Sequence, residues 1–215
     1  VDTPHITVVD QPTGHANIVV DDAGENSIVL FGGANNVLSE QMIGAALTEA
    51  SPRDWLLMQN ETSGQTYAAQ TARTLGLQVA YAAAPFDAGA IAAIIEDIDL
   101  LVLNAVEAAQ LRDATGQALE DLPMADIVVT LGGDGCKWVS SKGESQDFPA
   151  YAVDPVDTTG AGDTFTGYLV AGLDRGMPMD EAIDLASKAA ALMVTRHGTA
   201  DVIPDLKEIQ DHDFS

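Results

Sequence analysis

The sequence predicts an α/β fold in which a mostly parallel sheet is covered by helices on both faces and carries a small β lid. From Ser39 onward, helical and strand-like segments take turns along the chain. Those strand-like segments are apolar at successive positions, which is typical of strands that are buried on both faces of a sheet. Closer to the N-terminus, apolar and polar residues alternate, and this pattern predicts a separate antiparallel layer.

The antiparallel layer is expected from three short segments, 6–9, 16–20 and 27–31. A turn-forming run, Asp22-Ala23-Gly24-Glu25, separates the last two. A hairpin or meander of this length is too short to make a core by itself. We therefore expect residues 1–34 to form a β lid that packs on the larger domain or on a second copy of the chain, which would give a homodimer.

The remaining residues, 35–215, are expected to form one α/β domain. Ser39 can cap a helix that runs to about Ala50. The pattern then predicts, in order, a strand at 55–59, a helix at 66–75, a strand at 78–82, a helix at 88–96, and strands at 100–103 and 127–130. Because ligands of such sheets bind beyond the carboxyl ends of the strands, the residues that follow these strands are candidates for a functional site.

Composition and charge exclude several functions. The chain has 9 Lys and Arg against 33 Asp and Glu, a formal net charge of −24, so nucleic acid and anionic membranes are not expected partners. Cys136 is the one cysteine, which rules out an intrachain disulfide and favours a reducing compartment. Since no apolar run approaches the length that spans a bilayer, we expect a cytoplasmic protein.

The segment Asp157-Thr158-Thr159-Gly160-Ala161-Gly162-Asp163-Thr164-Phe165 is followed by an apolar helix through Leu173. Its glycines let the backbone approach a ligand, and the amides at the start of the helix can bind an anion. Asp163 would repel a phosphate, but it could orient a hydroxyl toward one and accept the proton of that hydroxyl. The alternative is that Asp163 is an ordinary acidic residue in the first turn of a helix.

Two common nucleotide-binding motifs are missing from the chain. The glycines at 132–135 and 160–167 do not fit the dinucleotide-binding pattern G-x-G-x-x-G. The P-loop pattern G-x-x-x-x-G-K-[ST] occurs nowhere. A dinucleotide dehydrogenase and a P-loop NTPase are therefore disfavoured.

The segment from Asp157 to Phe165 resembles the C-terminal signature of the ribokinase-like sugar kinases, the PfkB family, and the likeness extends along nearly the whole chain. Residues 13–14, 24–28 and 33–35 resemble the lid strands of the ribokinases more than those of fructokinases or adenosine kinases. The resemblance implies an ATP-dependent kinase, with Mg²⁺ and K⁺ as cofactors, that phosphorylates a primary hydroxyl of a pentose, with D-ribose as the first choice. The alternatives are another sugar or a nucleoside as acceptor, or a non-catalytic fragment that only binds nucleotide.

The resemblance also implies roles for particular residues. Asp163 would be the catalytic base and, together with Glu61, would contact the sugar. The backbone of Gly160, Ala161 and Gly162 would stabilise the transferred phosphoryl group. The residues that would contact the nucleotide are Asn104, Thr130, Gly132, Gly133, Gly135, Gly162 and Ser187.

Two ion sites are implied in the same way. Glu107, the last residue of an Asn-x-x-Glu motif, would organise magnesium and the waters around the phosphates; otherwise it is a solvated helix acid. A monovalent cation would lie between Asp157 and Thr159 on one side and the carbonyls of Met193, Arg196 and Gly198 on the other. Without the resemblance, the stretch around Arg196 and Gly198 would be an ordinary helix C-terminus.

The chain departs from the family pattern in three places. Ala82-Ala83-Ala84-Pro85 stands where ribokinases usually carry Asn-Pro-Ala-Pro, so the polar group at Ala82 is missing. Val202 replaces a residue that often completes the cation site with a side-chain oxygen, although its carbonyl could still serve. The N-terminal portion of the family, with part of the sugar site, is absent, and we expect the 215 residues by themselves not to phosphorylate ribose.

Overall fold

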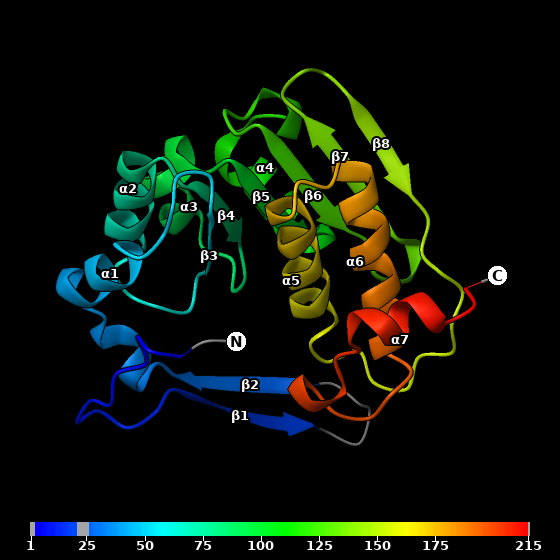
Figure 1. The fold of residues 1–215 in the computed structure, drawn as a ribbon, viewed down its shortest axis with the longest axis horizontal. Helices are drawn as coiled ribbons and strands as arrows, with labels where there is room; N and C mark the ends of the chain where they lie inside the picture. Colours follow the sequence, from blue (N-terminus) through cyan, green and yellow to red (C-terminus); the bar gives the residue numbers. More distant parts are fainter. Residues whose placement is uncertain (1–2, 21–25, 215) are drawn as a thin grey trace.

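The computed structural model describes residues 3–20 and 26–214, which fold into two separate sheets (Figure 1). β1 (His15–Val20) and β2 (Asn26–Phe31) form an antiparallel hairpin in which Ala16 pairs with Leu30. The hairpin lies along the lower edge of the view in Figure 1, apart from the larger sheet. The expected hairpin is therefore confirmed, while the turn expected at 22–25 lies outside the described residues.

The larger sheet has six strands in the order β3-β4-β5-β6-β7-β8. The strands are β3 (Trp55–Gln59), β4 (Gln78–Ala82), β5 (Leu100–Asn104), β6 (Asp126–Thr130), β7 (Cys136–Ser140) and β8 (Ser145–Phe148). The pairs from β3 to β6 are parallel, and β7 and β8 are added antiparallel. The prediction of a mostly parallel sheet is confirmed, and the carboxyl ends of β3 to β6 meet at one edge.

Helices connect the parallel strands and cover both faces of the sheet (Figure 1). One layer contains α1 (Glu40–Leu47), α2 (Gln65–Leu75), α3 (Ala88–Ile94) and α4 (Ala105–Thr115). The other contains α5 (Ala161–Asp174) and α6 (Met179–Met193), and α7 (Leu206–Asp211) follows near the C-terminus. Short 3-10 helices lie at Gly33–Val37, Ile95–Asp97, Leu119–Asp121, Gly132–Asp134 and Ala200–Val202.

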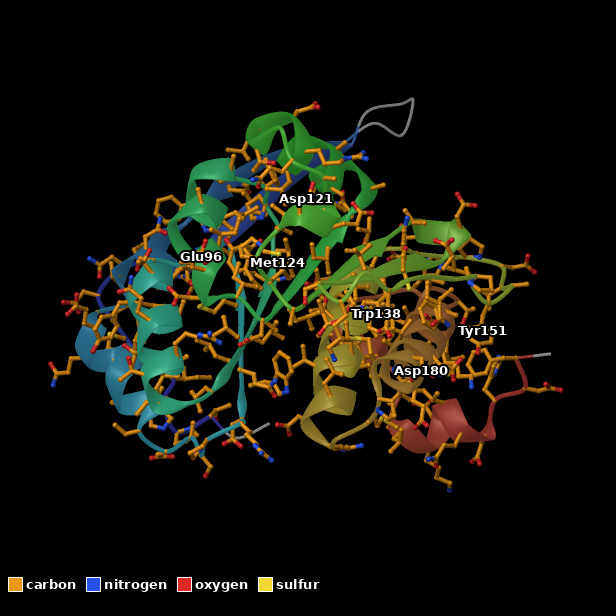
Figure 2. All side chains as sticks on the ribbon, turned by 90° about the horizontal axis from the view of Figure 1, so that it is seen from above. Glu96, Asp121, Met124, Trp138, Tyr151 and Asp180 are labelled. Atoms are coloured by element: carbon orange, nitrogen blue, oxygen red, sulfur yellow. The ribbon has the colours of Figure 1, made fainter. Side chains whose placement is uncertain are left out.

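In Figure 2, labelled side chains mark the two helical layers. Glu96, just after α3, lies with the first layer, and Asp180, in α6, lies with the second. Trp138 of β7 lies between them and donates its indole N–H to the carboxylate of Asp126 in β6, at 2.7 Å. Burial raises the pKa of that Asp126 carboxyl, so the antiparallel end of the sheet contains a shielded polar pair.

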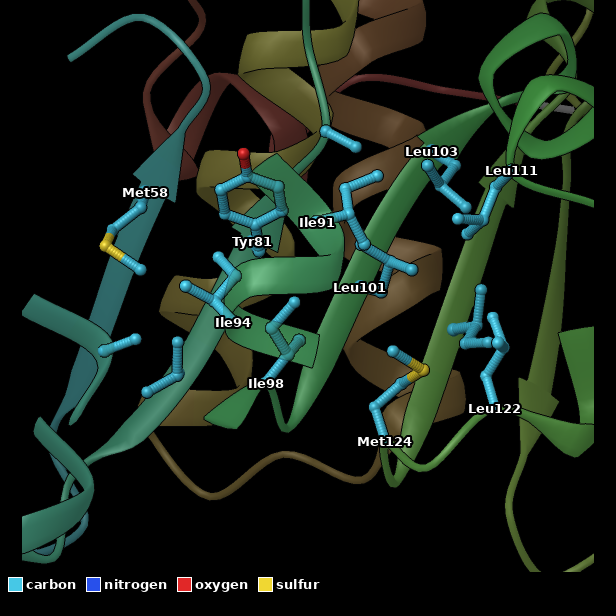
Figure 3. Close-up of a cluster of buried hydrophobic side chains, with 14 of the residues drawn as sticks. Met58, Tyr81, Ile91, Ile94, Ile98, Leu101, Leu103, Leu111, Leu122 and Met124 are labelled. Atoms are coloured by element: carbon cyan, nitrogen blue, oxygen red, sulfur yellow. The ribbon is translucent and has the colours of Figure 1, made fainter. Parts of the chain in front are cut away.

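The parallel strands are buried on both faces, as the apolar runs predicted. In β4, Val79 and Tyr81 point into the core beneath α1 to α4, while Ala80 and Ala82 point into the core beneath α5 and α6. Figure 3 shows the first of these cores, where side chains of α3 and α4 meet β4, β5 and the chain around Met124. Two packed layers on one sheet hold its carboxyl edge in a defined place.

The strand expected at residues 6–9 is wrong. These residues belong to no helix or strand, and Ile6 and Val8 are 74% and 95% exposed. Alternating residues become a strand only when another strand supplies hydrogen-bond partners for the backbone. Within the described part of the chain, the small sheet contains β1 and β2 alone, so this segment has no such partner.

The described helices are short relative to the thickness of a membrane. Among residues 3–20 and 26–214, none is both long enough and apolar enough to cross a bilayer. The longest of them, α6, has 15 residues and belongs to the core beneath the sheet.

Candidate active site

A cavity of about 440 Å³ lies where the β6–β7 connection, the segment after β8, α5 and α6 come together. Several residues predicted to contact a nucleotide or a phosphoryl group line this one cavity. They are Thr130, Gly132, Gly133, Gly135, Ala161, Gly162 and Ser187. Residues more than fifty positions apart in the sequence thus meet around a single space, which is large enough for part of a small-molecule ligand.

The apolar wall of this cavity was not found in the sequence. It is formed by Ala150, Tyr151, Ala152, Val153, Pro155, Phe165, Ala190, Ala191 and Val194. Within α6, Ala189 is fully buried and does not line the cavity. Ala190 and Ala191, however, lie three and four positions after Ser187, on the same face of α6. That spacing from a predicted site residue is the signal that could have identified them.

The wall that contains Tyr151 is tied to α6 by polar contacts. The Tyr151 hydroxyl donates to the carboxylate of Asp184, which also accepts from the ammonium group of Lys188 at 2.8 Å. Burial of the Tyr151 hydroxyl and its contact with Asp184 raise the tyrosine pKa. Figure 2 shows Tyr151 on the same side of the sheet as Asp180 of α6.

The start of α5 presents backbone amides toward the cavity. Gly160, the residue before the helix, has a φ of +80° and supplies no side-chain cap. The amide of Ala161 is already used, because it donates to the carbonyl of Thr158 at 3.2 Å. The amide of Gly162 meets no acceptor outside α5 among the described residues. Gly162 is therefore the freer of the two donors for an incoming anion.

Asp163 lies in the first turn of α5 with an exposed side chain. One of its carboxylate oxygens, Oδ1, accepts a hydrogen bond from Nε2 of Gln59 at 2.7 Å. Gln59 is the last residue of β3, and the exposed Glu61 follows two residues later. The structure thus brings the predicted base to the end of the strand that precedes the predicted sugar-binding residue.

Asn104 and Glu107 form a capping box at the start of α4. The amide of Glu107 donates to the Asn104 side chain at 2.9 Å, and the amide of Asn104 donates to Oε2 of Glu107 at 2.8 Å. Neither residue lines the cavity. Their spacing has a structural cause, because a capping box satisfies two backbone donors at a helix N-terminus. Oε1 of Glu107 takes no part in the box.

The two halves of the predicted cation site are adjacent. The amides of Val156 and Asp157 donate to the carbonyl of Val194, at 2.7 and 3.1 Å, just beyond α6. The Asp157 carboxylate accepts from the amide of Thr159 at 2.9 Å. Hydrogen bonds from Thr159, and then from the amide of Gly198, lower the pKa of Asp157.

Two residues on the other side of that site, Met193 and Arg196, form hydrogen bonds within the protein. The carbonyl of Met193 accepts from the amide of Arg196 at 3.0 Å. The guanidinium of Arg196 donates to the carbonyl of Val202 at 3.2 Å and to Glu208 at 2.9 Å. Because the positively charged guanidinium of Arg196 lies against the Val202 carbonyl, a cation is disfavoured at that oxygen. Val202 is therefore a poor ligand in this arrangement.

The charged side chains do not form a preformed metal cage. Among residues 3–20 and 26–214, no three His, Cys, Asp or Glu side chains are grouped so that they could hold a metal ion.

Cys136 is buried, and burial raises the pKa of its thiol to about 11. The thiol therefore stays protonated near neutral pH, and a protonated thiol is a poor nucleophile.

Comparison with known proteins places this arrangement in a family. The model of the pfkB family carbohydrate kinases matches residues 1–206. Ribokinase from Haemophilus influenzae is 38% identical over 97% of this chain, which covers 72% of that protein. The crystal structure of ribokinase from Thermotoga maritima superposes with a TM-score of 0.80 at 33% identity, over 94% of this chain and 70% of that chain.

A third relative was solved with ligands. Ribokinase from Arabidopsis thaliana, in complex with ribose and ATP, superposes with a TM-score of 0.76 at 26% identity, over 94% of this chain and 69% of that chain. This chain resembles these relatives in sequence and in fold along almost its whole length, and the likeness includes the lid hairpin and the larger sheet. The chain therefore belongs to the pfkB family of carbohydrate kinases, which are phosphotransferases with an alcohol group as acceptor.

Proposed function

We propose that this protein transfers the γ-phosphoryl group of ATP to a primary hydroxyl of a pentose, and that D-ribose is the acceptor. One observation carries the proposal: the exposed carboxylate of Asp163 comes directly after Gly162, whose free amide lines the cavity of about 440 Å³. The similarity to ribokinases, up to 38% identity among those compared, supports ribose over other acceptors.

The roles follow from the positions of the groups. The adenosine part of ATP occupies the cavity between the glycines of 132–135 and Ser187, and the phosphates of ATP reach the start of α5. The acceptor hydroxyl attacks the γ-phosphorus as the bond to the β-phosphate oxygen breaks, and ADP leaves. Asp163 accepts the hydroxyl proton, while the amide of Gly162 stabilises charge on the transferred group.

The acceptor is tested by a coupled assay of ADP release with ribose, 2-deoxyribose, fructose and nucleosides. The protein used is the product of the complete reading frame that contains these residues. We expect ribose to give the highest kcat/KM, with phosphate on the primary hydroxyl in the ³¹P and ¹H spectra of the product. Calorimetry with ATP and ribose distinguishes the rival function, because a nucleotide-binding module would bind ATP alone.

Magnesium would be held by Asn104 and Glu107 together with phosphate oxygens and water. Oxygen donors suit this ion, and Oε1 of Glu107 remains outside the capping box. When bound, the ion neutralises charge on the β- and γ-phosphates. That the described residues hold no preformed three-ligand cage is compatible with this, since Mg²⁺ commonly binds through one or two carboxylates and the substrate phosphates.

Replacing Glu107 by glutamine separates its two roles. Glutamine can complete a capping box, so the midpoint of thermal unfolding should not change. Removal of the charge should weaken Mg²⁺-dependent turnover by about 10–100-fold, the range for residues that support a bound metal. Glu107→Ala is the contrasting variant, because it also breaks the box and should lower stability by about 0.5–2 kcal/mol. Full activity in Glu107→Gln would mean that Glu107 serves only the helix cap and does not support a bound magnesium ion.

A potassium site beside the start of α5 is proposed between Asp157 and Thr159 and the carbonyls of Met193, Arg196 and Gly198. The contacts from 156–157 to Val194 support it, because they bring these segments together. We expect several-fold higher kcat in potassium than in sodium at equal ionic strength. Equal rates in the two salts, and in a Tris buffer without either, would contradict the site.

We propose that the chain has two parts, a β lid of residues 1–34 and an α/β domain of residues 35–215. We also propose that the lid joins two copies of the chain. In the hairpin, Val29, Leu30 and Phe31 are 63%, 60% and 47% exposed, so each face carries an exposed apolar side chain that a second lid could cover. Sedimentation of the wild type should show a dimer. A matched variant with Leu30→Glu should sediment as a monomer, while a monomeric wild type would contradict this role of the lid.

A further inference from the structure

Four α-helices in the described part of the chain carry an acidic residue at the third position of their first turn. In α4 it is Glu107, in α7 it is Glu208, in α5 it is Asp163, and in α6, whose cap residue is a proline, it is Glu181. Glu107 and Glu208 both fold back and accept a hydrogen bond from the amide of their helix's cap residue, at 2.8 Å in each case. An acid at this position therefore serves the helix cap wherever the cap residue also has a side chain to reciprocate.

Asp163 is oriented differently. The cap residue of α5 is Gly160, which has no side chain, and no reciprocal box forms there. The Asp163 carboxylate instead points away from its own helix and accepts from the side-chain amide of Gln59, 104 positions earlier in the chain. This is the one hydrogen bond that the described structure gives the Asp163 side chain.

The strand places Gln59 for this contact. Trp55 packs in the core beneath α5 and α6, whereas Met58 packs in the core beneath α1 to α4. Because side chains alternate along a strand, Gln59 shares the face of Trp55 and points toward α5. Gln59 is also held in register, since it pairs with Ala82 at the end of β4. Its amide is thus presented by the rigid sheet to the first turn of α5.

We propose that Gln59 is a positioning residue for the phosphoryl transfer, and that its side-chain amide holds the Asp163 carboxylate in the orientation that receives the acceptor hydroxyl. The inference rests on the proposed function of Asp163. Donation to Oδ1 fixes the rotation of the carboxylate and leaves Oδ2 for the proton of the acceptor. An exposed aspartate without this contact would sample several rotamers, of which a fraction would be productive.

The activity test uses two substitutions of nearly unchanged size. Gln59→Met removes the donor, and Gln59→Glu replaces it by an acceptor that repels Asp163. We expect kcat to fall about 10–100-fold in Gln59→Met, the worth of a hydrogen bond to a charged group, and further in Gln59→Glu. The Kd for ATP and the midpoint of thermal unfolding should stay at their wild-type values. Gln70→Met, the same change on an exposed position of α2, is the control.

Two results would overturn the proposal. The first is wild-type kcat in Gln59→Met. The second is an unchanged effect of Gln59→Met in an Asp163→Asn background, because two residues that act as a unit should not show independent effects.

A second readout keeps failure of this proposal distinct from failure of the proposed function. In ¹⁵N-labelled protein, the side-chain NH₂ signals of Gln59 should shift in Asp163→Ala. Those of Gln65, whose amide donates to Asn60 and to the carbonyl of Thr62, should not. If the wild type releases no ADP with ribose or any other acceptor, the proposed function fails, and the spectrum still reports the contact. If Gln59 does not respond, the contact is absent whatever the activity.

Discussion

Replacing Asp163 by asparagine is expected to lower kcat by about 10²–10⁴-fold, the usual contribution of a general base. The substitution keeps the size of the side chain and its ability to accept from Gln59, so the start of α5 should keep its shape. The Kd for ATP should stay near the wild-type value. A base that acts on the acceptor hydroxyl stabilises the transition state and contributes little to ground-state binding of nucleotide.

The measurement is kcat by coupled ADP release, with ATP binding by calorimetry on the same preparation. Asp174→Asn, at the exposed last position of α5, is the matched control and should retain wild-type kcat. If Asp163→Asn keeps more than about a tenth of the wild-type rate, Asp163 is not the base. A parallel loss of ATP binding would instead assign Asp163 to the nucleotide site.

The parallel strands could be predicted because each carries its own signal. Leu100 and Leu101 are both fully buried although they point to opposite faces of the sheet, and such a run needs no knowledge of neighbouring strands. The failed strand at 6–9 shows the limit of this approach. Alternation describes which side chains could face a core, but whether another strand lies alongside is a property of the whole fold.

The candidate site was predictable where one continuous segment supplies it. Residues 160–163 bring the left-handed glycine, the free amide and the carboxylate together by themselves. The contact of Gln59 with Asp163 was not predictable, since neither residue carries a mark of its partner so far along the chain. The spacing of Asn104 and Glu107 is ambiguous in a different way, because a helix cap and a metal site both require it.

The glycine loop after β6 offers the second large effect. Gly135 has a φ of +98°, in a region that other residues rarely adopt. A Cβ added there would lie 2.0 Å from the carbonyl oxygen of Phe148 and 2.7 Å from the amide nitrogen of Ala150. Both partners are backbone atoms, which cannot turn aside as a flexible side chain could. Gly135→Ala must therefore move either the loop or the segment after β8.

Both of those segments line the nucleotide cavity, so we expect Gly135→Ala to lose measurable ATP binding. Backbone strain alone should lower the free energy of unfolding by about 1–3 kcal/mol. Gly133→Ala is the matched control for stability, because a Cβ at Gly133 meets nothing within 4 Å and its φ is not positive. Its unfolding midpoint in urea should equal that of the wild type. Wild-type stability and ATP affinity in Gly135→Ala would mean that this glycine does not hold the loop against residues 148–150.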